Sequence, residues 1–256
     1  MIELATSSWT DVQEHVAAGG TLAILPFGAL EQHGPHLPLS TDTLQADGLA
    51  RRLAARFDAI LMPPVPYGQT WDNAGFPGTV SLSAATTTAV CLDLVRAVTG
   101  FGITTTVIVN GDYGNRLPLH SAAQQLATES IDVIVLDYPG LIEAGDDVKE
   151  TPWAAPGLCH ADEIETSLVM ALAPGTVRSD RMAASYPELP ADFGMRPLRF
   201  DTLSPSGVFG DPRPATADKG QRLLMLLEQH SAAAVQRHLD ALGGAVHPSA
   251  SAPDLN

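Results

Sequence analysis

The sequence predicts an α/β fold in which a mostly parallel β-sheet is covered by helices on both faces. Short apolar runs, rich in β-branched residues, alternate along the chain with longer runs of helix-forming residues. A repeated strand-then-helix order is typical of parallel sheets that lie between helical layers. The chain has 256 residues, of which 45% are hydrophobic, and this is enough for one large core.

The first half of the chain predicts helices and strands in alternation. Residues 10–18 form a short helix that two glycines end, and residues 21–27 (TLAILPF) have the length and branched character of a buried strand. A helix over residues 42–57 follows, rich in Ala, Leu and Arg. Residues 59–65 (AILMPPV) predict a strand, and residues 84–98 a helix that stops before a further pair of glycines.

The second half continues the same alternation. Residues 104–110 (TTTVIVN) and 131–137 (IDVIVLD) predict two more buried strands, separated by a helix over residues 117–128. Residues 160–173 and 215–242 predict helices, the second of them with a break allowed for. No linker interrupts this series, so the strand and helix pattern favours a single domain.

We place the domain at residues 1–247 and expect residues 248–256 (PSASAPDLN) to form a disordered tail. The chain carries 14 Lys and Arg against 29 Asp and Glu, a net charge of −15, which argues against nucleic acid and anionic membranes as partners. No apolar run approaches membrane-spanning length and no signal segment is present, so we expect a cytoplasmic protein. Two cysteines without a CxxC arrangement predict neither a disulfide framework nor a thiolate metal site.

The loop that follows the first buried strand offers several metal ligands. Residues 30–42 (LEQHGPHLPLSTD) contain Glu31, His33, His36 and Asp42, and glycines and prolines exclude regular structure there. Loops at the ends of strands are where open α/β sheets build their sites. Carboxylates and imidazoles without thiolates suit Zn, Mn or Fe(II). The alternative is a surface carboxylate, turn histidines and an aspartate that only caps a helix.

The loop after the strand at residues 104–110 offers one more carboxylate. Residues 110–115 (NGDYGN) place polar side chains and two glycines where a backbone can approach a ligand closely. Asp112 is therefore a candidate third ligand, although the same residues also suit an ordinary Asx-turn without chemistry.

A third segment, residues 160–167 (HADEIETS), places a carboxylate on an apolar helix face. Glu165 lies three and four positions before Leu168 and Val169, so it shares the face that those side chains bury. A carboxylate on such a face must be neutralised, paired or bound to metal, unless it reaches solvent or caps the helix. His160 can handle protons or act as a polar cap.

Four blocks of sequence together resemble the creatininase superfamily of binuclear metal hydrolases. They are LPFGALEQHGPHLPLSTD at residues 25–42, the NG-x-x-x-N loop at 110–115, HADEIETS at 160–167 and GVFGDPRPATADKGQ at 207–221. The resemblance implies a three-layer α/β/α sandwich, a pair of divalent metal ions (Zn, Mn or Fe) and a homo-oligomer, often a hexamer.

The resemblance also assigns roles to particular residues. It implies that Glu31 and Asp42 hold one ion, and that His33 and a bridging Asp42 hold the other. It makes His160 the catalytic residue that handles protons or substrate near the metals. Glu165 matches the acid that completes the second ion's ligands in members with glycine at the position of Gly114, and it is a second catalytic candidate.

One position departs from the family's pattern. Members usually have NGHGGN or NGHYEN, in which the histidine is a metal ligand, and this chain has Asp112 in its place. Aspartate can ligate as well, in a harder donor set that favours Mn or Fe over Zn. The opposite interpretation is that the change weakens one site, so that a single ion binds.

The function implied is metal-dependent hydrolysis of a C–N bond, an amide that can be cyclic, in a small molecule by a metal-activated water. His160 or Glu165 would pass a proton to the departing nitrogen. Tyr113 and Trp153 are candidate substrate-binding residues, as aromatic side chains often line such sites. Two alternatives stay open: a peptidase that trims a modified peptide, and a non-hydrolytic descendant (a lyase, isomerase or binding protein) in which Asp112 marks an altered metal site.

Overall fold

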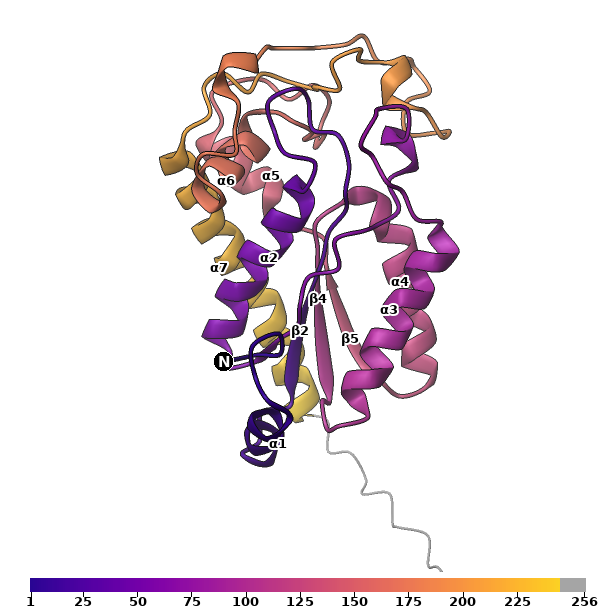
Figure 1. The fold of residues 1–256 in the computed structure, drawn as a ribbon, viewed down its shortest axis with the longest axis vertical. Coiled ribbons are helices and arrows are strands. Elements are labelled where there is room, and N and C mark those ends of the chain that lie inside the picture. The colour runs from indigo at the N-terminus through magenta and orange to yellow at the C-terminus, as the bar shows by residue number, and fades with distance from the viewer. Residues whose placement is uncertain (245–256) are drawn as a thin grey trace, which may run out of the picture.

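A computed structural model describes residues 1–244 of the chain; the tail predicted at residues 248–256 lies outside the described residues. Its central feature is a five-stranded sheet with the strand order β1-β3-β2-β4-β5, in which all neighbouring strands are parallel (Figure 1). The strands are β1 (Ile2–Glu3), β2 (Leu22–Phe27), β3 (Ile60–Leu61), β4 (Thr105–Asn110) and β5 (Asp132–Leu136). The predicted parallel sheet is confirmed.

Helices cover both faces of this sheet and make three layers. The helices are α1 (Trp9–Ala17), α2 (Thr41–Arg56), α3 (Ala84–Thr99), α4 (Arg116–Thr128), α5 (Leu141–Val148), α6 (Glu163–Leu172) and α7 (Ala217–Gly244). One core lies between the sheet and α2, α5, α6 and α7, and a second core lies between the sheet and α1, α3 and α4 (Figure 1). No helix within residues 1–244 is both long enough and apolar enough to cross a membrane.

Several element boundaries differ from the predicted ones for local reasons. The strand predicted at 59–65 is only two residues long, because two consecutive prolines follow Met62 and cannot donate to a neighbouring strand. The helix predicted from His160 begins at Glu163, since the Asp162 side chain caps it by accepting from the amides of Ile164 and Glu165. Helix α7 runs without a break, and β1 and α5 were not predicted.

The register of the central strands places two loops side by side. Phe27 at the end of β2 pairs with Asn110 at the end of β4, so the loops that follow leave the sheet at the same edge. The chain passes from β2 to β3 on one side and later returns to β4 on the other side. Such a change of direction opens a crevice at the carboxyl ends of the strands, where ligands of open α/β sheets bind.

Helix α6, which carries Glu165, packs closely on α7 at Gly220. A Cβ atom at position 220 would collide with the backbone carbonyl of Ser167. We expect Gly220→Ala to lower the melting temperature by several degrees, because overpacking at backbone costs about 1–3 kcal/mol and each kcal/mol shifts the melting temperature of a chain this size by roughly 2–4 °C. Gly243→Ala is the control, since nothing described lies within 4 Å of a Cβ there. Equal loss in both variants would contradict close packing at Gly220.

Candidate metal centre

The predicted ligands meet in one buried cluster at the carboxyl ends of β2 and β4. The loop after β2 supplies Glu31 and His33, the first turn of α2 supplies Asp42, and α6 supplies Glu165; all four side chains are buried. The Nε2 atom of His33 lies 3.1 Å from Asp42 Oδ1, 3.5 Å from Glu165 Oε2 and 3.9 Å from Glu31 Oε1. The loop keeps its shape because the Glu31 amide donates to the Leu39 carbonyl at 3.0 Å.

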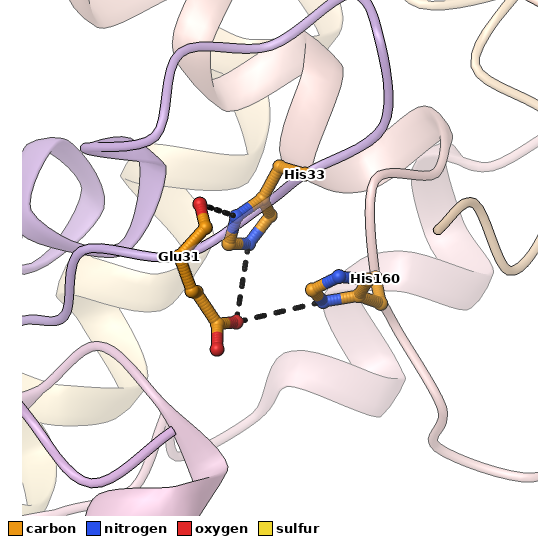
Figure 2. A group of neighbouring side chains, drawn as sticks. All are labelled: Glu31, His33 and His160. Atoms are coloured by element: carbon orange, nitrogen blue, oxygen red, sulfur yellow. Dashed lines mark hydrogen bonds and ion pairs between the residues drawn. The ribbon is translucent and has the colours of Figure 1, made fainter. Parts of the chain in front are cut away.

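Two overlapping groups of three side chains bring ligand atoms within 4.8 Å of one another. One group is His33, Asp42 and Glu165, and the other is Glu31, His33 and His160. In the second group, shown in Figure 2, His160 Nδ1 lies 3.8 Å from Glu31 Oε1, and the two imidazole ring centres are 4.4 Å apart. The first group is the ligand set that the sequence resemblance implies for one of the two ions.

Asp112 lies beside this cluster and uses its two oxygens differently. Its Oδ1 atom accepts from the Gly114 amide at 2.9 Å, which is the Asx-turn that the sequence also allowed. Its Oδ2 atom is buried and has no hydrogen-bond partner among residues 1–244. Burial and the nearby carboxylate of Asp42 raise the pKa of Asp112 well above its ordinary value. The turn therefore leaves one oxygen free for a cation.

The cluster has the chemistry of a cation site. Besides Asp112 Oδ2, the buried atoms His33 Nε2 and Asp42 Oδ2 have no hydrogen-bond partner within the described chain, although buried polar atoms normally have one. Burial and neighbouring carboxylates raise the pKa of Glu31, and burial raises the pKa of Asp42 to about 6. Such crowding of buried carboxylates is unfavourable without positive charge. The residues present therefore fit divalent metal ions.

We expect the metal-free protein to be more stable near pH 6 than at pH 8. Folding raises the pKa values of three carboxylates above their ordinary values: Asp42, Glu31 and Asp112. As the pH falls towards 6, these carboxylates therefore bind protons in the folded protein and not in the unfolded chain. The pKa of His33 shifts in the same direction, since Asp42 and Glu165 outweigh the effect of its burial.

This pH dependence can be read from melting temperatures of chelated protein between pH 8 and pH 6. The same protein loaded with Mn²⁺ is the control, because bound metal keeps the carboxylates ionised and should remove or reverse the trend. A chelated protein that is more stable at pH 8 would contradict the clustered, mutually repelling carboxylates.

A chain of amides that the sequence did not predict holds His160 and Glu31 in place. Gln32 Oε1 accepts from the Gly34 amide at 2.9 Å, and Gln32 Nε2 lies 2.6 Å from Asn73 Oδ1 and 2.7 Å from His160 Nε2. Asn73 Nδ2 in turn donates to Glu31 Oε2 at 2.9 Å. Of the two amide residues, only Gln32 could have been suspected from the sequence, because it stands between the predicted ligands Glu31 and His33.

The Gln32 contact sets the protonation of His160. Burial and the neighbouring His33 lower the pKa of His160 to about 3, so the ring is neutral at physiological pH. Because the Gln32 amide donates to Nε2, the proton of the neutral ring lies on Nδ1, the nitrogen that faces Glu31. His36 takes no part in the ligand groups; it is fully buried, with its Nε2 atom 3.0 Å from the Thr166 hydroxyl.

The two predicted substrate-binding aromatics lie at different distances from the centre. Tyr113 lines the cavity beside the ligands, with 41% of the residue exposed, and its hydroxyl donates to the Gly157 carbonyl at 3.4 Å. Trp153 does not line that cavity; its Nε1 donates to Asp146 at 2.8 Å, and its ring lies close to Gly145 on α5. The substrate role of Trp153 stays a prediction.

The cavity at the cluster is small and lined by both polar and apolar groups. Its volume is about 40 Å³, room for a few ions or water molecules. Besides the candidate ligands, its walls include Asp137 and Tyr138, which directly follow β5. Neither residue was singled out from the sequence, although both stand at the end of a predicted strand, the place where such sites form.

Comparisons with known proteins agree with this geometry. The creatininase family model, described as creatinine amidohydrolase, matches residues 5–235. A creatinine amidohydrolase from Pseudomonas putida is 30% identical over 244 residues, which cover 90% of this chain and 94% of the relative. A mycofactocin precursor peptide peptidase from Mycobacterium ulcerans (strain Agy99) is 33% identical over 211 residues, 78% of each chain.

Solved structures show the same fold. A structure named creatininase Mn is 27% identical, has a TM-score of 0.82, and the match covers 93% of this chain and 98% of that one. A mutant creatininase of Zn-Zn type has the same identity and TM-score, with 92% and 97% covered. With the family model matching most of its length, the chain belongs to the creatininase family.

Proposed function

We propose that the protein is a metal-dependent amidohydrolase that cleaves a C–N bond, an amide that can be cyclic, in a small molecule. The observation that carries this proposal is the buried cluster in which His33, Asp42 and Glu165 converge within ligand distance of one another. The family relatives named above are hydrolases of creatinine or of a precursor peptide.

The residues that would hold metal fall into two sets that share Asp42. Glu31, Asp42 and Asp112 would hold one ion, and His33, Asp42 and Glu165 the other. Divalent ions at such a site lower the pKa of water and polarise a carbonyl oxygen. The solved creatininase structures named with Mn and with Zn-Zn support either metal as the resident one. The set of Glu31, Asp42 and Asp112 consists of carboxylates only, and such a set favours Mn.

His160 would supply the proton that the leaving nitrogen needs. Its neutral ring carries the proton on Nδ1, which faces the cluster, while Gln32 holds Nε2. Glu165 is ionised over the physiological range, because the neighbouring His33 outweighs the effect of burial and lowers the pKa of Glu165 to about 2. Glu165 therefore acts as a ligand or proton acceptor and His160 as the donor, a task worth roughly 10²- to 10⁴-fold in rate.

The test combines elemental analysis with hydrolysis of two kinds of substrate by purified protein. We expect about two divalent ions per chain after loading with Mn²⁺ or Zn²⁺, and hydrolysis of at least one small cyclic amide, such as creatinine or hydantoin, that chelation abolishes and reloading restores. Cleavage of short peptides alone would favour the peptidase alternative. A protein that binds no transition metal, or one that binds metal and hydrolyses neither kind of amide, would contradict the proposal.

Two further properties belong to this proposal and rest on the sequence resemblance. We propose a homo-oligomer, a hexamer in the family's usual form, and a cytoplasmic location. Light scattering of the purified full chain tests the first, and a monomer at micromolar concentration would contradict it.

A further inference from the structure

The chain leaves β5 through a strained residue that lies at the metal centre. Tyr138 has a φ angle of +48°, in the left-handed region that bulky side chains seldom adopt. It is also one of the residues that line the cavity around Asp42, Asp112 and Glu165. Strained backbone of this kind persists only where the surrounding structure holds it, and it often occurs at functional sites.

Contacts on both sides fix this turn. The Asp137 carboxylate accepts from Asn110 Nδ2 at 2.8 Å and lies 2.8 Å from His120 Nε2, so the residue before Tyr138 is tied to the end of β4 and to α4. The residue's own carbonyl accepts from the Leu141 amide at 3.1 Å, at the start of α5. The position of Tyr138 relative to the sheet edge is therefore set by three neighbouring elements.

The side chain of Tyr138 is anchored at one end only. Its ring packs against the core that lies between the sheet and α2, α5, α6 and α7, and its hydroxyl is buried without a hydrogen-bond partner among residues 1–244. The hydroxyl of Tyr113, the other tyrosine of the cavity, already donates to the Gly157 carbonyl. A buried hydroxyl without a hydrogen-bond partner is unfavourable. A molecule that enters the cavity and accepts a hydrogen bond from the Tyr138 hydroxyl would remove this cost.

We propose that the Tyr138 hydroxyl donates a hydrogen bond to the carbonyl oxygen of the bond being cleaved. This inference rests on the proposed hydrolysis. When the oxygen of water bonds to the carbonyl carbon, the C=O electron pair moves to the carbonyl oxygen, and the hydrogen bond from Tyr138 becomes stronger. The pair returns as the C–N bond breaks: His160 gives its Nδ1 proton to the departing nitrogen, and Glu165 takes the proton lost by the water and returns it to His160. Tyr138 keeps its own proton throughout.

The first test is Tyr138→Phe, which removes the hydroxyl and keeps the ring that packs on the core. We expect kcat to fall about 10²-fold with KM and metal content unchanged, since losing one preorganised donor to such an oxyanion costs about 10²–10³ in kcat. Tyr186→Phe is the matched control, because the Tyr186 hydroxyl donates to the Pro152 carbonyl at 3.4 Å and the residue, 45% exposed, does not line the cavity. Unchanged kcat, or loss of metal, in Tyr138→Phe would overturn the inference.

A binding measurement separates this inference from the proposed function. Inorganic phosphate presents tetrahedral oxyanions, so its affinity for the Mn²⁺-loaded protein, measured by calorimetry, reports the donor without any turnover. We expect phosphate to bind Tyr138→Phe at least about tenfold more weakly than it binds wild type or Tyr186→Phe. If wild type hydrolyses no amide, the proposed function fails, and the phosphate result still shows whether the Tyr138 hydroxyl donates to a bound oxyanion. Equal phosphate affinity in all three proteins would contradict that role.

Discussion

Replacing Asp42 by asparagine is expected to empty the metal centre and to reduce hydrolysis by more than the ~10–100-fold that loss of an outer-sphere partner costs. Asp42 lies 3.1 Å from His33 Nε2, and its second oxygen is buried without a partner among the described residues. It is the one carboxylate common to both proposed ligand sets. An amide of the same shape lacks the charge that would hold the ions, so both sets weaken together.

Metal content by elemental analysis and kcat/KM at saturating Mn²⁺ measure this effect. Asp47→Asn is the matched control, because Asp47 lies on the same helix and pairs with Arg51 at 2.7 Å away from the centre. Removing one of the crowded carboxylates should also make the metal-free Asp42→Asn variant at least as stable as metal-free wild type. Full metal content in this variant would exclude Asp42 as a shared ligand.

Replacing Asp112 is expected to change how many ions bind and which metal is preferred. Asp112→Ala should lower the metal content from about two ions to about one per chain and reduce hydrolysis more than 100-fold, since one ligand of the binuclear site is lost. Asp112→Asn isolates that role, because the amide oxygen can still accept from the Gly114 amide and keep the turn. We expect its metal content to fall as in Asp112→Ala while its melting temperature stays that of wild type.

Asp112→His restores the residue usual in the family and separates the remaining interpretations. A hydrolase with a modified centre should keep its activity and bind Zn²⁺ more tightly relative to Mn²⁺, because imidazole is the softer ligand. If the aspartate at position 112 has abolished hydrolysis, the Asp112→His variant should gain hydrolytic activity or bound metal. No change in metal content, metal preference or hydrolysis would favour a non-hydrolytic descendant and contradict a ligand role for Asp112.

The sequence predicted the parts of the fold that depend on local pattern. The buried strands β2, β4 and β5 were predicted to within a residue, since apolar runs with branched side chains have few other conformations. The short strand β1 and the helix α5 carry weaker patterns and were not predicted. Two consecutive prolines end β3 early, although the apolar run that contains them predicts a longer strand.

The candidate ligands could be proposed from the sequence because several of them share one loop. Glu31, His33 and Asp42 lie within a dozen positions, in a Gly- and Pro-rich segment that follows a strand. The Gln32–His160 contact joins residues 128 positions apart, and the Asn73–Glu31 contact joins residues 42 apart. Contacts at such separations depend on how the sheet orders its strands, which no local pattern contains.

The sequence alone predicts a parallel α/β sheet with a set of carboxylates and imidazoles at its edge, and a resemblance to a family whose members hydrolyse C–N bonds. How those groups face one another depends on tertiary packing. It left the free oxygens of Asp42 and Asp112 buried and unpaired, put the proton of His160 on the nitrogen facing Glu31, and held the Tyr138 hydroxyl at the cavity. Side-chain identity is a local property, whereas burial and hydrogen-bond partners arise only when distant segments pack together.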